Sequence, residues 1–187
     1  MTGPREAEAA LTAFLSRHEE IGGWDEEWAG VPLRFRAYLG DEAPAREHVG
    51  SVRAIVFRGE EVLVVEEGNF TGLVVGGRPN PGEAIQDALV REVAEETGWL
   101  TVPGPVVGFI HARRREGGRR PPSNWRRPDP DFIEPIFAVE AADFDTARLE
   151  ENPKPVRFMP IEEAVEQLHP LLKQFLERAV NGRYFQG

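Results

Sequence analysis

The first part of the chain has the apolar spacing of a helix. Residues 5–21 carry their apolar side chains roughly at helical spacing, at Ala9, Leu11, Phe14, Leu15 and Ile21. This pattern predicts an amphipathic helix over 5–21. The glycines in the next segment, GGWDEEWAG, are expected to end that helix, and VPLRFRAYLG after it is predicted to be extended.

Strand patterns follow. SVRAIVFR (51–58) and EVLVVEE (61–67) are separated by Gly59-Glu60, which predicts a hairpin with Val52, Ala54 and Val56 on one face. Further strands are predicted at VVGFIHA (106–112), DFIEPIFAVEA (131–141) and VRFMP (156–160). The proline within 131–141 favours an edge strand or a bulge.

Helical patterns lie between and after these strands. A glycine- and proline-rich loop over 72–82 leads into residues 83–97, which lack both residue types and are predicted to form a helix that Gly98 ends. IEEAVEQL and LLKQFLERAV are predicted as two helices divided by Pro170. The alternation predicts one α/β domain over 46–187, preceded by an N-terminal extension, 1–45, of a helix and an extended arm.

Composition narrows the function classes. The 187 residues are 41% hydrophobic and 29% charged, as in a globular protein with a buried core. The absence of cysteine excludes disulfides, thiolate metal sites and a cysteine nucleophile. No apolar run is long enough for a membrane span, and the acidic first twenty residues do not form a secretory signal. We therefore expect a cytoplasmic protein without a membrane partner.

Charge is distributed unevenly. The net charge is −10, but the segment from Arg113 to Arg127 holds seven arginines and one acid, a local +6 that leaves −16 elsewhere. Such a cluster points to a bound polyanion, for instance a small molecule that carries phosphates. The alternative is a solvated loop whose arginines pair with acids elsewhere on the surface.

Three carboxylates gather on the helix predicted for 83–97. Glu96 lies about 40° and Glu95 about 60° from Glu92 around the helix axis, on opposite sides of it. A patch of like charges beside an apolar stripe is costly unless a cation neutralises it, and oxygen ligands favour Mg²⁺ or Mn²⁺. The alternative is an ordinary solvated acidic helix end.

The spacing around these glutamates resembles that of a known family. The Nudix box has the pattern GX5EX7REUXEEXGU, in which U is a bulky aliphatic residue. This chain follows the pattern with Gly77, five residues, Glu83, seven residues, Arg91-Glu92-Val93, Ala94, Glu95-Glu96, Thr97 and Gly98. Only the last position departs, with Trp99 in place of an aliphatic residue. The chain thus resembles the Nudix hydrolases.

The resemblance implies an α/β/α sandwich around a mixed sheet and hydrolysis of nucleoside diphosphates linked to another moiety. It implies that Glu92, Glu95, Glu96 and the carbonyl of Gly77 bind Mg²⁺ or Mn²⁺, with more than one ion per site. Glu83 is expected to bind through water or to stabilise the loop. Arg91 is expected to orient the glutamates.

Two roles are less defined by the box. The general base is either a box glutamate or a downstream acid, with Glu150 and Glu151 ahead of Glu134 and Glu116. Arginines of the basic segment are expected to bind the substrate phosphates. A tryptophan of the same segment is expected to stack on a base of the substrate, and the alternative is that its ring anchors the loop on the sheet. These candidates are Arg113, Arg114, Arg115, Arg126, Arg127 and Trp125.

Several alternatives stay open. An isomerase of the same fold is disfavoured because, by resemblance, it uses a cysteine. A non-catalytic nucleotide sensor is the main rival, and an RNA-end pyrophosphohydrolase is disfavoured because the acidic remainder suits no long nucleic acid. Nucleotide sugars, dinucleoside polyphosphates and nucleoside triphosphates all remain candidate substrates, and a homodimer is compatible with the resemblance.

Overall fold

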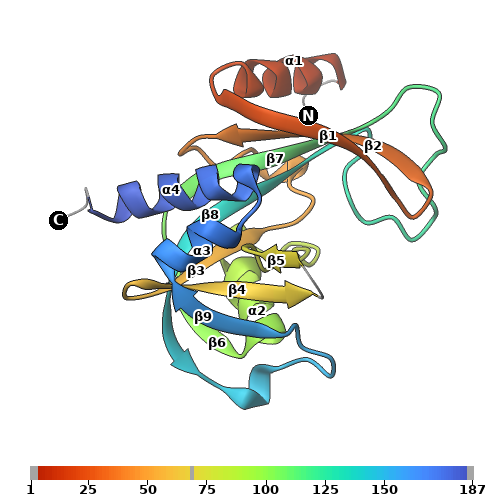
Figure 1. Cartoon of the computed structure of the whole chain (residues 1–187). Helices are drawn as coiled ribbons and strands as arrows, with labels where there is room; N and C mark the ends of the chain where they lie inside the picture. Colours follow the sequence, from red (N-terminus) through yellow and green to blue (C-terminus); the bar gives the residue numbers. More distant parts are fainter. Residues whose placement is uncertain (1–3, 68–69, 185–187) are drawn as a thin grey trace.

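A nine-stranded mixed sheet forms the centre of the molecule in the computed structural model, which describes residues 4–67 and 70–184 (Figure 1). Its strand order is β1-β2-β7-β8-β3-β4-β5, with β6 added to β8 and β9 to β4. Only the β3–β8 pair is parallel among the pairs of the described residues. The strands are β1 (Glu19–Trp28), β2 (Val31–Leu39), β3 (Arg53–Arg58), β4 (Glu61–Glu67), β5 (Phe70–Gly72), β6 (Trp99–Val102), β7 (Val106–Arg114), β8 (Asp131–Phe144) and β9 (Val156–Pro160).

Helices cover both faces of this sheet. They are α1 (Pro4–Leu15), α2 (Ile85–Thr97), α3 (Ile161–Gln167) and α4 (Pro170–Tyr184). Figure 1 shows α3 and α4 on one side of the sheet and α2 on the other. The predicted α/β/α sandwich is confirmed, and Pro170 divides the last two helices as expected because it starts α4.

Strand β3 shows how the alternation of apolar residues builds two cores. Ala54 and Val56 are buried toward α2, while Ile55 and Phe57 are buried toward α3 and α4. Such strands, buried on both faces, have nearly continuous apolar sequences. The predicted β3–β4 hairpin and its shared face are both confirmed.

The N-terminal prediction was wrong in part. The helix ends at Leu15, and Glu19–Trp28 forms β1 where a glycine-broken segment was predicted. A register shift between Glu20 and Gly22 leaves Ile21 as the extra residue, and the β1–β2 pairing stacks the Trp24 ring on Phe35 at 5.0 Å between ring centroids. Cross-strand packing therefore outweighs the poor strand propensity of the glycines.

The described part of the N-terminal segment contributes β2 to the sheet, because β2 pairs along β7 from Leu33↔Arg114 to Leu39↔Gly108. Helix α1 packs Leu11 into a cluster with Tyr38, Phe109 and Ile133. Treating this segment as an extension separate from 46–187 stays a prediction.

The proline of β8 does not lie on a sheet edge, contrary to one of the two expectations. Strand β8 lies between β7 and β3, and pairing with β3 begins at Ile136, one residue after Pro135. The other expectation is supported, because the β7–β8 register shifts between Val106 and Gly108, opposite Ile136 and Phe137. The missing N–H therefore falls where the sheet is already irregular.

Candidate active site

Helix α2 presents the predicted carboxylates beside its buried stripe. Ala88, Leu89 and Val93 pack into the core, which turns Glu92 and Glu96 toward the glycine loop. Gly98 adopts the left-handed conformation, and its N–H donates to the Ala94 carbonyl at 2.8 Å. The helix therefore ends at the predicted residue, although it begins two residues later than predicted.

Arg91 connects the carboxylates of the box. Its Nε and Nη2 donate to Glu83, and its Nη1 donates to both Glu92 and Glu95, with all four donor–acceptor distances at 2.8 Å. Nη2 also donates to the Arg78 carbonyl at 3.1 Å. The hydrogen bonds from Arg91 lower the pKa of Glu83 to about 2. This placement supports the predicted orienting role of Arg91.

The two loop glycines are required by close contacts. A Cβ on Gly76 would lie 2.2 Å from the Val52 carbonyl oxygen, and a Cβ on Gly77 would lie 1.9 Å from Oε2 of Glu92. The Gly77 carbonyl accepts a hydrogen bond from the Val52 N–H at 2.8 Å, which leaves it one further lone pair. A Cβ at position 76 would meet backbone, and a Cβ at position 77 would displace the end of the Glu92 side chain.

Glu92 and Glu96 differ in their surroundings. Burial raises the pKa of Glu92, and the neighbouring carboxylates of Glu95 and Glu96 raise it further against the effect of Arg91. Glu96 accepts a hydrogen bond from the Gly76 N–H at 2.7 Å and forms an ion pair with Lys154 at 2.7 Å. The patch thus lies beside the loop and is partly neutralised by two cationic side chains of the chain itself.

A metal remains a prediction. Among residues 4–67 and 70–184, no three His, Asp or Glu side chains are gathered closely enough to form a ligand set. Arg91 contacts Glu92 and Glu95, and Lys154 contacts Glu96, so these cations engage the oxygens that a metal would use. The donor set of three carboxylates and a free carbonyl lone pair nevertheless suits a hard divalent ion.

A cleft of about 1110 Å³ adjoins the loop and Glu92. Its wall comprises the loop from Gly76 to Pro81, the start of β3, the short turn 46–48 and the end of the basic segment. Five arginines line it, namely Arg46, Arg53, Arg78, Arg126 and Arg127. Of the predicted phosphate-binding arginines, the structure therefore brings Arg126 and Arg127 to the cleft that Glu92 also lines.

The other three predicted arginines do not reach this cleft. They lie at the end of β7 and line a separate groove with Arg34 and Glu116. Each forms an ion pair with an acid, and these pairs are Arg113 with Asp131 and Glu8, Arg114 with Asp129, and Arg115 with Asp25. Their placement favours the alternative of arginines neutralised by surface acids.

Trp125 lies among aromatic side chains. Its ring packs edge-on against Phe132 with centroids 6.2 Å apart, and the Arg127 guanidinium lies 5.5 Å from its centroid. The ring is partly buried in the cluster with Val31, Leu33 and Phe35 and is not part of the cleft wall. This placement favours the loop anchor over base stacking.

The candidates for the general base lie in different surroundings. The N–H of Glu150 donates to the Glu95 carbonyl at 2.9 Å, so the loop that carries Glu150 and Glu151 lies against the end of α2, with both side chains exposed. Glu134 is buried, and its two oxygens accept from Arg53 at 3.3 and 3.4 Å. Glu116 is exposed at the separate groove. The geometry favours the Glu150 loop without assigning the base.

Sequence reasoning missed Arg46, Arg53 and Arg78 in the cleft wall, and Lys154 beside Glu96. Arg53 donates to the Gly76 carbonyl at 2.8 Å and to Glu134, and thereby joins β3, the loop and β8. A charged residue within an apolar strand is the signal that suggests such a buried pair. Lys154, a lone cation in an acidic stretch, is the corresponding signal for the contact with Glu96.

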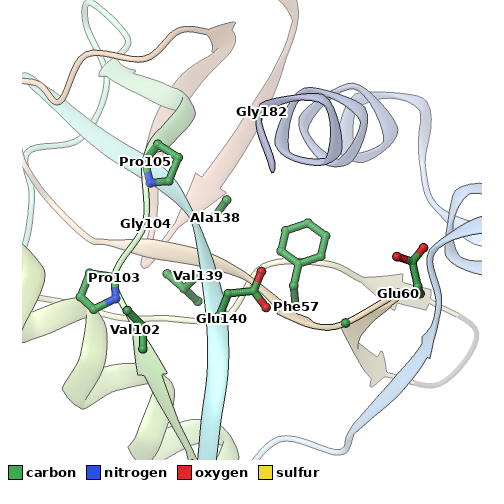
Figure 2. Close-up of a pocket in the computed structure, with 11 residues that line it drawn as sticks. Phe57, Glu60, Val102, Pro103, Gly104, Pro105, Ala138, Val139, Glu140 and Gly182 are labelled. Atoms are coloured by element: carbon green, nitrogen blue, oxygen red, sulfur yellow. The ribbon is translucent and has the colours of Figure 1, made fainter. Parts of the chain in front are cut away.

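A smaller cavity of about 430 Å³ lies elsewhere, between β3, β8 and the end of α4. Figure 2 shows Phe57, Glu60 and Glu140 in its wall, together with the turn from Val102 to Pro105. None of the residues predicted from the box or the basic segment lines it. The larger cleft is therefore the candidate active site.

The sandwich, the glycine loop and the glutamates of α2 together define a Nudix-type architecture. A family model described as the NUDIX domain matches residues 47–179, so the chain belongs to this family. The family match confirms the prediction made from the box and the assignment to the Nudix class of hydrolases.

Solved structures with a similar fold include the pyrophosphohydrolase BsRppH of Bacillus subtilis. It is 16% identical, with a TM-score of 0.56, over 88% of this chain and 98% of its own. A NUDIX hydrolase from Nitrosomonas europaea is 23% identical, with a TM-score of 0.49, over 71% of this chain and 90% of its own. At these identities the likeness concerns the fold. No curated protein matches the chain in sequence.

Among the described residues, no helix is both long enough and apolar enough to cross a membrane.

Proposed function

We propose that this chain is a divalent-metal-dependent hydrolase that cleaves the pyrophosphate linkage of a nucleoside diphosphate joined to another moiety. One observation carries the proposal. Glu92 meets the Gly77 backbone at the wall of a cleft of about 1110 Å³ that arginines also line. Burial and the neighbouring carboxylates raise the pKa of this glutamate. Carboxylates and guanidiniums in the wall of one cleft suit a phosphate substrate.

Glu92, Glu95, Glu96 and the Gly77 carbonyl are the residues that would hold Mg²⁺ or Mn²⁺, and three carboxylates suit more than one ion. A bound divalent ion supplies charge compensation for the phosphates and lowers the pKa of a water molecule. Arg91 contributes by holding the side chains of Glu83, Glu92 and Glu95 in fixed positions. Lys154 would have to leave Glu96 when such an ion binds, because both compete for the same oxygens.

The reaction adds water across the bridging P–O bond, so that one phosphate gains a hydroxyl oxygen and the other leaves with the bridging oxygen. A carboxylate must accept the proton of the attacking water. The candidates are a glutamate of the box and, on the adjacent loop, Glu150 or Glu151. Arg126 and Arg127 in the cleft bind the diphosphate or a further anionic group of the substrate.

The test is hydrolysis of a panel of nucleoside diphosphate derivatives with Mg²⁺, followed as phosphate released by a coupled phosphatase. We expect turnover by the wild type and a loss on the order of 10³-fold in Glu92→Gln/Glu96→Gln, because the metal ligands are removed. Glu162→Gln/Glu166→Gln is the matched control, since both of these glutamates are exposed on α3.

Equal activity in the wild type and the Glu92→Gln/Glu96→Gln variant would place the metal site on other residues. Absence of turnover in every arm, combined with tight nucleotide binding, would instead support the non-catalytic sensor. Location in the cytoplasm and a homodimer stay predictions that this assay does not address.

A further inference from the structure

The cleft wall carries more positive than negative charge. Five guanidiniums line it, against the carboxylates of Glu47 and Glu92. Arg53 is held by Glu134, but the other four have no carboxylate within ion-pair distance in the part of the chain that the structure describes. These four, which we call the free arginines, are Arg46, Arg78, Arg126 and Arg127.

Arg127 is the most constrained of the free arginines. Its guanidinium lies 4.9 Å from the ring centroid of Trp28 and 5.6 Å from that of Phe132, so the aromatic cluster fixes its position. Burial lowers the pKa of Arg127, the charge of Glu134 partly offsets this effect, and the nearby charges of Arg78 and Arg53 lower the pKa further. A guanidinium held beside like charges is costly without a bound anion.

Two donors in the cleft wall also lack acceptors. Nε of Arg127 is buried with no hydrogen-bond partner in the described residues. The same holds for Oγ of Ser51, a residue that is only 1% exposed and lines the same cleft. Buried donors are nearly always paired in proteins, so an unpaired donor at a ligand cleft points to an acceptor supplied by the ligand.

We propose that the free arginines bind further phosphates of the substrate, beyond the two that flank the cleaved linkage, so that the substrate carries a chain of three or more phosphates. This inference rests on the proposed function, because it places the cleaved linkage at the Glu92 end of the cleft. A nucleotide sugar supplies only two phosphates and would leave the free arginines without counter-charges. A nucleoside or dinucleoside polyphosphate supplies the missing charge and the missing acceptors.

The test is a binding measurement, which does not depend on turnover. Isothermal titration calorimetry measures the affinity of the full chain for ATP, inorganic tripolyphosphate and ADP-glucose. Each titration is run once with EDTA and once with Ca²⁺. We expect ATP to bind at least about tenfold more tightly than ADP-glucose, since further charge-assisted hydrogen bonds form. Tripolyphosphate tells whether the phosphate chain alone or the whole nucleotide is bound.

The informative variants replace exposed arginines, because Arg127 packs on aromatic rings and its loss would disturb the fold. We expect Arg126→Gln/Arg78→Gln to weaken ATP binding by about tenfold or more and ADP-glucose binding by no more than about twofold. Arg120→Gln is the matched control, since Arg120 is exposed in the same segment and does not line the cleft.

Three results would overturn the inference, namely ADP-glucose binding as tightly as ATP, unchanged ATP binding in Arg126→Gln/Arg78→Gln, or no binding of either polyphosphate. If the enzyme hydrolyses a nucleotide sugar under those results, the inference fails while the proposed function stands. If ATP binding depends on Arg126 but nothing is hydrolysed, the phosphate site stands and the proposed catalysis fails.

Discussion

The two ends of the segment from Arg113 to Arg127 have the same residue type but opposite surroundings. Arg113, Arg114 and Arg115 each pair with an acid at the end of β7. Arg126 and Arg127 line the cleft, and neither has a carboxylate within ion-pair distance in the described part of the chain. The local charge of +6 therefore includes one group that acids neutralise and another group that remains for a ligand.

The acids that neutralise the first group come partly from the N-terminal segment. Glu8 of α1 and Asp25 of β1 reach Arg113 and Arg115 at 3.4 and 3.2 Å. The N-terminal segment thus contributes to the neutralisation of Arg113 and Arg115. Charge density along a sequence cannot separate the two groups. Glu8 and Asp25 lie far away in the chain, and Asp129 and Asp131 are nearer in sequence to Arg127 than to the arginines that they neutralise.

If this comparison is correct, the stability lost on removing an arginine should follow how firmly its acid partner is buried. Arg53 should then show the largest effect, because its partner Glu134 is only 5% exposed. We expect Arg53→Met to lower the free energy of unfolding by about 3–5 kcal/mol, since it leaves a buried carboxylate without its counter-charge. Urea unfolding at neutral pH measures the loss.

The double variant Arg53→Met/Glu134→Leu is the control for this prediction. It removes the stranded charge, and apolar replacements of buried ion pairs are often neutral or stabilising, so the double variant should recover most of the lost stability. A loss below about 1 kcal/mol in Arg53→Met would show that burial of the acid partner does not determine how much stability is lost when an arginine is removed.

An intermediate effect is expected for the pair of Arg91 and Glu83, which can be probed by pH. The pKa of Glu83 is lowered from 4.5 to about 2 in the folded chain by its hydrogen bonds to Arg91. The stabilisation is therefore fully present above pH 4.5 and is lost as the pH falls through about 2. We expect Glu83→Gln to cost about 2 kcal/mol at neutral pH and to make stability less dependent on pH in that window.

Urea midpoints of the wild type and Glu83→Gln across this acid range provide the measurement. The difference between the two proteins should shrink as the medium becomes more acidic. Glu162→Gln on α3 serves as the control, because the same charge is removed from an exposed position. A difference that grows with acidity would mean that Glu83 is not held as a carboxylate by Arg91.

Local sequence signals account for the parts of the fold that were predicted. The β3–β4 hairpin follows from alternation interrupted by Gly59, and the end of α2 follows from Gly98. Strand β1 was missed because its glycines and acids are typical of loops. Its strand conformation depends on pairing with β2 and on the Trp24–Phe35 contact, which no local pattern encodes.

The same distinction applies to the site. The spacing of the box places Glu92 and Glu96 beside Gly77 and gives Arg91 its carboxylate partners, since all of these positions are close in sequence. Arg53 and Lys154 were missed because their partners are distant in the chain; Arg53 and Glu134 are 81 residues apart. Folding alone brings such pairs together.

The smallest effect is expected where the two groups of the basic segment are compared directly. Arg114 and Asp129 form a pair with distances of 2.7 and 3.0 Å, but Asp129 is 37% exposed. Exposed pairs contribute little, so Arg114→Gln should lower the free energy of unfolding by less than about 1 kcal/mol. Arg126→Gln, which removes no ion pair, should cost no stability.

Ligand affinity should show the reverse order. Arg126→Gln is expected to weaken ATP binding, whereas Arg114→Gln is expected to change it by no more than about twofold, because Asp129 already neutralises Arg114 and the intervening solvent screens its charge. Asp129→Asn sharpens the comparison, since it releases Arg114 from its partner without removing the guanidinium. If Arg114→Gln weakened ATP binding as strongly as Arg126→Gln, the two ends would act as one anion-binding surface.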